Sequence, residues 1–268
     1  MRATLLLGAV LLLAGCTGTP HLPEQAIRAV SQDSRVQYIV LHYTSSSLAE
    51  SLATLSRGQV SSHYLLGEDG YVWQLVDDNE RAWHAGESQW QGRTYLNASS
   101  IGIELVHLGY TDRADGSRQW HPYDPRQITA LKTLLAELLK RHQLGPERVL
   151  GHSDIAPGRK VDPGPLFPWA ELAESGLAQA PSEPAIAQAT TALASQLPAA
   201  DWFVEQLKAL GYLPPWYALS VDPEQTQLSK ALSAFQLRYR PGNFRGEMDL
   251  ASAALLAALA TQRPLLQQ

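Results

Sequence analysis

The stretch Val36-Gln37-Tyr38-Ile39-Val40-Leu41-His42-Tyr43 is the clearest strand signal in the chain. Its side chains alternate between two faces, as the period of two in a β-strand requires. Val40 and His42 fall on one face, and Leu41 falls on the other. A histidine at the end of an apolar strand needs a polar partner, because burying its ring without one costs free energy. The sequence therefore predicts a buried strand that delivers His42 to a polar site.

Further strand-like and helix-like runs follow this strand along the chain. A serine cluster offers caps for a short helix at residues 48–55. Short apolar runs predict strands at residues 63–66, 71–76, 101–106 and 148–151. Between the first two of these strands, Gly67-Glu68-Asp69-Gly70 is a hairpin signal. Interleaved strands and helices predict an α/β domain over residues 35–177, with a mixed central β-sheet flanked by helices.

The clearest helix signal begins at Asp124. Asp124 can cap the helix, Pro125 suits its first position, and Gln127 completes a capping-box arrangement. An apolar stripe with helical spacing follows, formed by Ile128, Leu131, Leu134, Leu135, Leu138 and Leu139. Gly145 is expected to end the helix.

The C-terminal third has a different composition. Residues 178–198 are rich in Ala, Ser, Thr, Gln and Pro, and this composition predicts a linker. Beyond it, amphipathic runs predict helices at residues 201–210, 223–239 and 250–260. Three short helices over residues 199–268 predict a small helical domain, near the lower size limit for an independent core.

Composition and charge exclude several classes of protein. The 268 residues carry 21 Lys plus Arg against 26 Asp plus Glu, a formal charge of −5, which argues against nucleic-acid binding. Hydrophobic residues make up 45% of the chain, enough to bury a core. The single cysteine, Cys16, excludes an internal disulfide and a Cys-based zinc cluster. No Gly-x-x-x-x-Gly-Lys motif is present, so no nucleotide cofactor is expected.

The N-terminus has the layout of a secretory signal. Arg2 precedes about a dozen apolar residues, a run too short to span a bilayer. Leu13-Ala14-Gly15-Cys16 resembles the bacterial lipobox, which implies a signal peptide over residues 1–15 and a lipidated Cys16 at the head of a tether over 16–34. Thr17 then favours the periplasmic face of the outer membrane, because the resemblance associates Asp at this position with inner-membrane retention. The alternative is a plain signal peptide with an incidental cysteine.

Three residues have the types required of a catalytic zinc site. His42 and His152 each end an apolar strand, and Asp162 lies ten residues after His152 in a proline-rich loop. Two imidazoles and one carboxylate with a fourth position open is a recognised catalytic zinc arrangement. The alternative is that these histidines are hydrogen-bonded parts of the framework. Glu104, inside the apolar run 101–106, is either the base that such a site needs or a salt-bridged strand residue.

Six ordered sequence blocks carry a more specific resemblance. Residues 38–169 resemble the zinc-dependent N-acetylmuramoyl-L-alanine amidases of the second amidase family, which are related to the AmpD enzymes and to peptidoglycan recognition proteins. The matching blocks are Ile39-Val40-Leu41-His42-Tyr43-Thr44, Ser61-Ser62-His63-Tyr64-Leu65, Ala82-Trp83-His84-Ala85-Gly86, Asn97 with Ser100-Ile101-Gly102-Ile103-Glu104, Gly151-His152-Ser153-Asp154-Ile155-Ala156-Pro157, and Arg159-Lys160-Val161-Asp162-Pro163-Gly164-Pro165.

This resemblance assigns roles to individual positions. It implies that zinc is bound by His42, His152 and Asp162, that Glu104 is the catalytic carboxylate, and that Lys160 is the cation near the scissile amide. It also implies a substrate groove lined by His63, Trp83, His84 and Asn97. For His63 and His84, the alternative is that they only brace the sheet or the loop. The remaining histidines near this region, His107, His121 and His142, match no motif and are expected on the surface.

The C-terminal segment resembles the three-helix peptidoglycan-binding domain. Residues 202–212 fit its first helix, and Ala231-Leu232-Ser233-Ala234-Phe235-Gln236 fits its second. Residues 240–247 depart from the common Asp-Gly-x-x-Gly loop, so the resemblance extends to the fold more than to glycan binding. With the lipobox, the whole chain is similar to the AmiD-type lipoprotein amidases.

The resemblance implies a function in cell-wall turnover and recycling. The expected reaction is hydrolysis of the amide between N-acetylmuramic acid, or its 1,6-anhydro form, and the L-alanine of the stem peptide. The expected partners are peptidoglycan, muropeptides and, through Cys16, the inner leaflet of the outer membrane. Two alternatives remain, a peptidoglycan recognition protein without activity and a stem-peptide endopeptidase on the same scaffold.

Overall fold

The computed structural model describes residues 29–222 and 224–262. The signal peptide, the lipobox and Cys16 lie outside the described residues, as does Pro223, the expected start of one helix. The chain divides into two units, residues 1–33 and residues 34–268, and the elements below belong to the second. Within the described ranges, no helix combines the length and apolar character needed to cross a bilayer.

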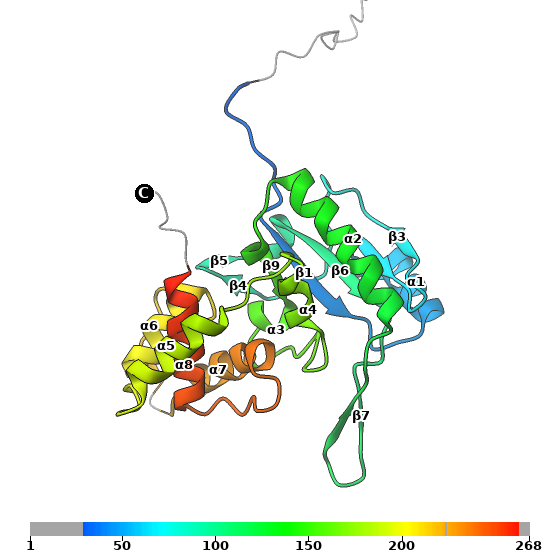
Figure 1. Cartoon of the computed structure of the whole chain (residues 1–268). Coiled ribbons are helices and arrows are strands. Elements are labelled where there is room, and N and C mark those ends of the chain that lie inside the picture. Colours follow the sequence, from blue (N-terminus) through cyan, green and yellow to red (C-terminus); the bar gives the residue numbers. More distant parts are fainter. Residues whose placement is uncertain (1–28, 223, 263–268) are drawn as a thin grey trace, which may run out of the picture. The chain divides into compact units, whose positions relative to one another are not determined.

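A five-stranded mixed sheet forms the centre of the unit, with strand order β3-β2-β6-β1-β9 (Figure 1). Strands β1, β6 and β9 run parallel, β2 is parallel to β6, and β3 pairs antiparallel with β2. The bounds are β1 Tyr38–Tyr43, β2 Tyr64–Leu66, β3 Val72–Gln74, β6 Ser100–Leu105 and β9 Val149–Gly151. The predicted mixed α/β class is confirmed, and each strand lies within one or two residues of its predicted bounds at either end.

One face of the sheet packs against helix α2 (Pro125–His142) and helix α4 (Trp169–Glu174). The leucine stripe of α2 meets Ile39, Leu41 and Ile103 in a continuous buried cluster. The Asp124 side chain accepts the Arg126 N–H, and Pro125 occupies the first turn, so the predicted start is confirmed.

The predicted capping box of α2 is wrong. The Gln127 side chain does not return to the helix start, because its amide donates to the carbonyls of Leu66 and Val106, each at 3.0 Å. The predicted end at Gly145 is also wrong. The helix stops at His142, since Gln143 adopts a left-handed conformation with φ of 56°.

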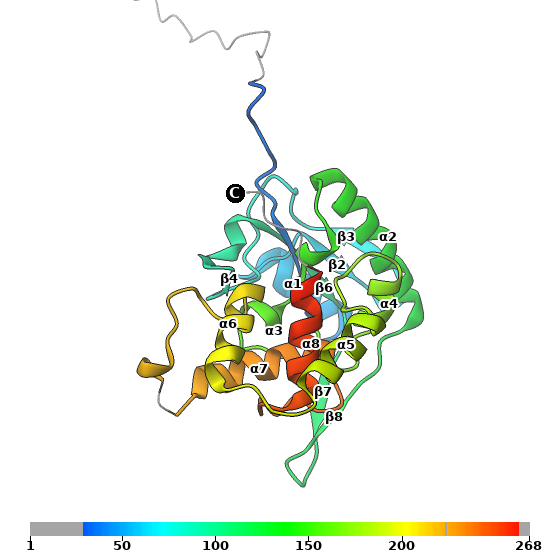
Figure 2. The same ribbon diagram turned by 60° about the vertical axis from the view of Figure 1, so that its left-hand side comes forward.

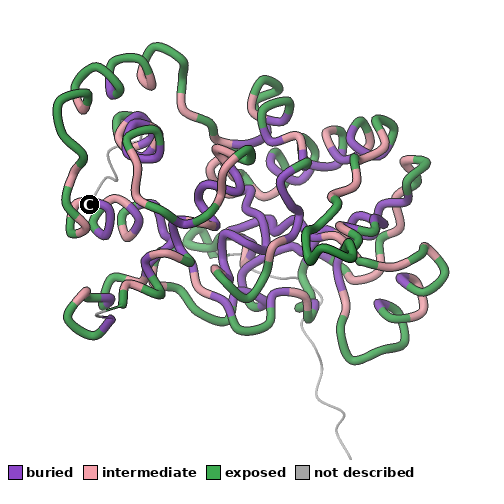
Figure 3. The backbone as a smooth tube through the Cα atoms, turned by 90° about the horizontal axis from the view of Figure 1, so that it is seen from below, coloured by how far each residue is buried: buried purple, intermediate pink, exposed green. Residues whose placement is uncertain are grey.

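The opposite face of the sheet packs against the C-terminal helices. Tyr38, Val40 and Leu150 share one buried cluster with residues of α6 (Ala200–Leu210), α7 (Thr226–Tyr239) and α8 (Leu250–Thr261). Figures 1 and 2 show these helices on the side of the sheet away from α2. The purple backbone in the middle of Figure 3 is the buried core between the layers. The three predicted C-terminal helices are therefore confirmed, and they are part of the same compact unit as the sheet.

The predicted linker at residues 178–198 contains a helix. Helix α5 (Glu183–Leu193) begins where the Ser182 side chain accepts the Ala185 N–H, with Pro184 in the first turn. It packs along α8. The alanine-rich composition that indicated a linker is equally a composition of high helix propensity, and packing against α8 decides between the two.

Short elements connect these layers. Helix α1 (Leu48–Arg57) starts with a Ser47–Glu50 capping box, and helix α3 (His152–Ile155) follows β9 directly. The hairpin β7–β8 (Tyr110–Asp112 and Arg118–Trp120) projects from the body (Figure 1), whereas the hairpin β4–β5 (Gln89–Trp90 and Arg93–Thr94) packs through Trp90 against Tyr212. The single-turn 3-10 helices are η1 Leu96–Ala98, η2 Pro146–Arg148 and η3 Leu219–Val221.

Candidate metal centre and active site

The carboxyl ends of three parallel strands meet at one edge of the sheet, and the polar residues of the site gather there. His42 lies near the end of β1, and Glu104 is its register partner on β6. Paired residues of neighbouring strands project from the same face, so the two side chains stand side by side. His152 follows β9, and the loop that carries Asp162 is joined to α3 by a hydrogen bond from Ser153 N–H to the Asp162 carbonyl.

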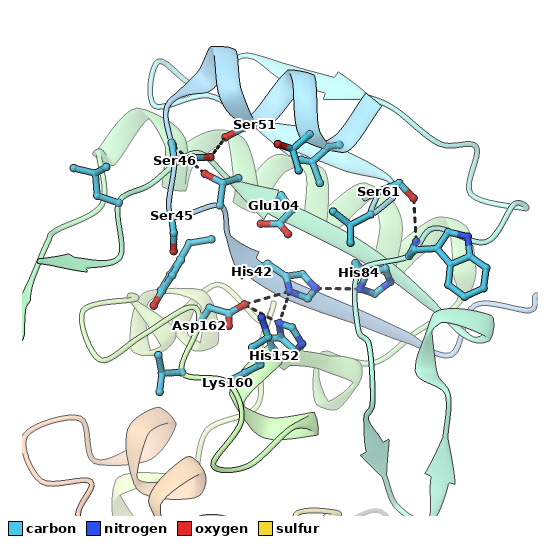
Figure 4. A pocket seen from close by; sticks show the side chains of 18 of the residues that line it. His42, Ser45, Ser46, Ser51, Ser61, His84, Glu104, His152, Lys160 and Asp162 are labelled. Carbon is cyan, nitrogen blue, oxygen red and sulfur yellow. Dashed lines mark hydrogen bonds and ion pairs between the residues drawn. The ribbon is translucent and has the colours of Figure 1, made fainter. Parts of the chain in front are cut away.

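Three candidate ligand atoms form a small triangle (Figure 4). Nδ1 of His42 lies 2.9 Å from Nδ1 of His152 and 3.2 Å from Oδ2 of Asp162, and the third side measures 3.0 Å. Ligand atoms on one face of a tetrahedral zinc site lie about 3.3 Å apart, given zinc–ligand distances of roughly 2.0–2.1 Å. The donor types and their spacing therefore fit a divalent metal ion.

The protonation of the triangle also suits a cation. Burial lowers the pKa of His42 to about 4, with His152 adding to the effect and Asp162 opposing it. Burial alone would raise the pKa of Asp162, but the neighbouring His152 and His42 hold that pKa well below its usual range. A neutral His42 imidazole beside the Asp162 carboxylate offers a lone pair, which is the state that metal ligation requires.

His152 is oriented by the backbone. Its Nε2 lies 3.1 Å from the carbonyl oxygen of Ala85 and 3.4 Å from Arg159 Nη2, so the shorter contact assigns the Nε2 proton to the carbonyl. The other nitrogen, Nδ1, is then left with its lone pair toward Asp162.

Glu104 faces the same cavity as the triangle, and its Oε2 has no hydrogen-bond partner among the described residues. Burial raises the pKa of Glu104 to about 8, Asp162 adds to the rise, and Lys160 opposes it. The structure thus contradicts the alternative of a salt-bridged strand glutamate, because an unpaired carboxylate oxygen is costly to bury without a function or a bound group.

The cavity measures about 680 Å³ and is open to solvent on one side. Lys160 lies exposed at its wall, and within the described part of the chain its ammonium forms no ion pair. The structure therefore brings together the five residues predicted to carry the chemistry, His42, Glu104, His152, Lys160 and Asp162.

The four predicted groove residues divide into three kinds. Trp83 is 52% exposed and lines this cavity as well as a second one of about 890 Å³ beside the C-terminal helices. His84 also lines the first cavity. Asn97 is mainly a brace, because its Oδ1 accepts the N–H groups of His84 and Ala85 at 3.0 and 2.8 Å.

His63, the fourth residue predicted for the groove, is not among the residues that line either cavity. His63 is fully buried behind the sheet edge, where its Nδ1 accepts the Gly102 N–H at 3.0 Å and its Nε2 lies 3.1 Å from the Glu80 carbonyl. Its position in the block Ser61-Ser62-His63-Tyr64-Leu65, which resembles the family, indicated function, but both ring nitrogens contact the backbone.

The prediction of three surface histidines fails for two of them. His107 is buried and stacks on Tyr123 with 3.9 Å between ring centroids, and the side chain of His142 is 7% exposed and pairs with Asp78 at 3.1 Å. The sequence reasoning also overlooked Arg159, which lines both cavities and donates to the Ala85 carbonyl at 2.8 Å. Its place beside Lys160 in a matching block was the available signal.

The comparisons with known proteins agree with this geometry. The family model described as N-acetylmuramoyl-L-alanine amidase matches residues 32–165. The chain is 38% identical to N-acetylmuramoyl-L-alanine amidase AmiD of Escherichia coli, with 95% of each chain covered. It is 40% identical to the 1,6-anhydro-N-acetylmuramyl-L-alanine amidase AmpD of the same species over 45% of this chain and 60% of AmpD.

Two solved structures extend the similarity to the whole fold. E. coli AmiD in complex with anhydro-N-acetylmuramic acid-L-Ala-D-gamma-Glu-L-Lys superposes with a TM-score of 0.78 at 37% identity, covering 88% of this chain and 93% of AmiD. AmpDh3 of Pseudomonas aeruginosa superposes with a TM-score of 0.83 at 34% identity, covering 92% of this chain and all of AmpDh3. The chain belongs to the N-acetylmuramoyl-L-alanine amidase family, as its six sequence blocks predicted.

Proposed function

We propose that the protein is a zinc enzyme that hydrolyses the amide between the lactyl group of N-acetylmuramic acid and the L-alanine of the stem peptide. The observation that carries the proposal is the triangle of His42, His152 and Asp162 donor atoms, 2.9–3.2 Å apart, beside the unpaired Glu104 carboxylate. The anhydromuramyl peptide bound by the similar AmiD supports this substrate class, including the 1,6-anhydro form.

The metal-binding triangle and Glu104 have different roles in the proposed hydrolysis. A zinc ion bound by the triangle supplies Lewis acidity, which polarises a carbonyl and lowers the pKa of a water molecule. Glu104 accepts a proton from the water molecule as the water oxygen attacks the amide carbon. It then delivers that proton to the leaving nitrogen as the C–N bond breaks, so the carboxylate returns to its starting state.

Lys160 has a separate electrostatic role. Its ammonium group at the cavity wall favours the negative charge that develops on the amide oxygen. The same positive charge lowers the pKa of Glu104, which keeps part of the base in its ionised form.

The test is the Glu104→Gln variant, which keeps the size of the side chain and removes the base. We expect hydrolysis of muropeptides to fall by about 10² to 10⁴, with zinc content unchanged. Glu174→Gln, an exposed carboxylate at the end of α4, is the matched control and should keep wild-type turnover. Near wild-type turnover of Glu104→Gln would show that another group is the base.

Mass spectrometry of the digest separates the candidate functions. An amidase releases intact stem peptides, an endopeptidase releases shortened peptides, and a recognition protein leaves the muropeptides unchanged. Digests of anhydro and ordinary muropeptides in parallel would also give the sugar preference.

We also propose that Cys16 is lipidated and anchors the protein to the outer membrane, facing the periplasm. The motif Leu13-Ala14-Gly15-Cys16 supports this placement. We expect Cys16→Ser to leave the membrane fraction, while Thr17→Ser, a conservative change at the next residue, remains with it. Membrane fractionation followed by immunoblotting makes the measurement, and a Cys16→Ser protein that still sediments with outer membranes would refute lipid anchoring.

A further inference from the structure

A chain of hydrogen bonds runs from His42 away from the cavity. Nε2 of His42 lies 3.0 Å from Nδ1 of His84, and Nε2 of His84 lies 3.2 Å from the Ser100 hydroxyl. Ser100 in turn donates to the Leu96 carbonyl at 2.6 Å. His42 and His84 are labelled in Figure 4, where a dashed line joins their rings.

The Leu96 carbonyl at the end of this series of hydrogen bonds determines which group donates and which accepts in each of them. A carbonyl oxygen only accepts, so the single proton of the Ser100 hydroxyl points to Leu96. The hydroxyl oxygen must then accept from Nε2–H of His84, which leaves Nδ1 of a neutral His84 as an acceptor. His42 therefore donates from Nε2, and its Nδ1 keeps a lone pair toward the triangle.

The ring of His84 is held in this position by two independent features. Its backbone N–H donates to Asn97 Oδ1 at 3.0 Å, which fixes the loop. The ring also lies directly on Gly102 of β6, where an added Cβ would lie 2.4 Å from Cγ of His84. Only glycine leaves room for the ring at this point of the strand.

The two histidines of the triangle thus reach the same tautomer by different routes. His152 donates directly to the carbonyl of Ala85, whereas His42 reaches the carbonyl of Leu96 through two side chains. We propose that His84, supported by Ser100 and seated on Gly102, is a positioning residue that holds the proton of His42 on Nε2 and aims Nδ1 at the metal. This inference rests on the metal assignment above, and it differs from the groove role that the sequence resemblance implies for His84.

Three variants test the role from different directions. His84→Phe keeps a ring and removes both nitrogens. Ser100→Ala removes the hydroxyl that links His84 to the Leu96 carbonyl. Gly102→Ala displaces the His84 ring without changing a polar group. Gly242→Ala is the matched control for the glycine change, because an added Cβ there meets nothing within 4 Å. Each purified protein is stripped of metal, checked for folding by circular dichroism, and titrated with zinc against a chromophoric chelator.

We expect the zinc dissociation constant to rise about 10- to 100-fold in His84→Phe and Gly102→Ala, and by a smaller factor in Ser100→Ala. The visible absorption spectrum of the cobalt-substituted variants should change as well, since it reports on ligand geometry. Gly242→Ala should match wild type in both measurements.

Other results would overturn the proposal. Wild-type zinc affinity and cobalt spectra in the variants, with a raised KM only, would make His84 a substrate contact and not a positioning residue. If His84→Phe does not fold, Ser100→Ala decides, because it leaves the His84 ring in place. A wild-type protein that binds no zinc would remove both this role and the metal assignment.

Discussion

At the scale of single residues, Glu104 combines two opposing demands. A base must be ionised, yet burial raises the pKa of this carboxyl to about 8, and the nearby Asp162 adds to the rise. A metal ion bound by the triangle would lower the pKa of Glu104 and so favour the ionised form that a base requires. The side chain is thus adapted to the metal-loaded protein and is strained electrostatically in the metal-free one.

This conflict predicts a pH-dependent stability for the metal-free protein. The folded pKa of Glu104 is about 8 against an ordinary value of 4.5, so between these values the folded state holds a proton that the unfolded state releases. Stability must therefore fall as pH rises through this window. We expect metal-free Glu104→Gln to melt at a higher temperature than metal-free wild type above pH 8, with the difference vanishing near pH 4.5.

Thermal melts in chelator from pH 4.5 to 9 make this measurement. The control Glu174→Gln should follow wild type throughout. A constant difference between Glu104→Gln and wild type across this range would show that Glu104 has an ordinary pKa in the folded protein.

The residue scale also shows how far sequence reasoning reaches. His42, Glu104 and His152 could be predicted because each interrupts an apolar strand or stands at its end, where polarity needs an explanation. His63 and His84 could not be separated in advance, because each is a single histidine in a short block that matches the family, and the sequence does not show what its ring nitrogens contact. Only the coordinates reveal that both nitrogens of His63 bond to the backbone, whereas His84 bonds to His42.

At the scale of elements, the start of α2 joins two strands of the sheet. The Gln127 amide is fully buried and donates to the carbonyls of Leu66 and Val106, where β2 and β6 end. One side chain of the helix thus gives the Val106 carbonyl a donor and gives the Leu66 carbonyl a second one, since Leu66 also accepts the Val106 N–H at 2.8 Å.

Gln127→Leu is expected to lower the free energy of unfolding by about 1–3 kcal/mol, because it keeps the helix and the apolar bulk but leaves a buried carbonyl unpaired. Thr129→Ala, on the exposed side of the same helix, should change it by less than about 0.5 kcal/mol. Urea denaturation followed by circular dichroism compares the two, and equal stabilities would mean that water replaces the Gln127 amide.

Element boundaries were predictable where one residue decides them, as Asp124 does for α2. They were not predictable where tertiary contacts decide. Gln127 had a local partner available in a capping box and bonded to distant strand ends, and α5 forms in an alanine-rich segment because α8 supplies a surface for it. Both errors arise from contacts between residues far apart in sequence.

At the scale of the whole molecule, a buried ion pair joins the C-terminal helices to the turn that carries a metal ligand. Arg238 of α7 pairs with Asp154 at 2.8 Å, and both side chains are almost wholly buried. The guanidinium also lies 4.1 Å from the centre of the Trp169 ring, and the Tyr212 hydroxyl donates to Asp154 Oδ1 at 2.8 Å. Asp154 stands two residues after His152, so these contacts secure α3 from the C-terminal side.

Arg238→Met should destabilise the protein by about 3–5 kcal/mol, since it leaves the Asp154 carboxylate buried without its cation. Asp154→Asn combined with Arg238→Met should recover part of this loss, because the uncompensated charge is then gone. Lys208→Met, which breaks the exposed pair with Glu205, should cost less than about 1 kcal/mol.

Chemical denaturation of the four proteins provides the comparison. An Arg238→Met variant as stable as Lys208→Met would show that the C-terminal helices are not held to the sheet through this pair.

The catalytic and C-terminal regions, which the sequence predicts as two domains, contribute to one hydrophobic core. A three-helix motif in sequence suggests an independent module, but Tyr38, Val40 and Leu150 of the sheet belong to the same core as Phe203 and Phe235. Sequence periodicity identifies an apolar face without identifying what covers it, so the shared core could not be predicted.

The shared core has a consequence for the order of events during biosynthesis. The first strand of the sheet starts at Tyr38, while the helices that bury one of its faces end at Thr261. In a chain emerging from the ribosome or from an export channel, the strands are therefore available long before the helices that cover Val40 and Leu150. We expect this face of the sheet to stay partly exposed until α8 has emerged, and chaperones that bind apolar surface would protect it in the interval.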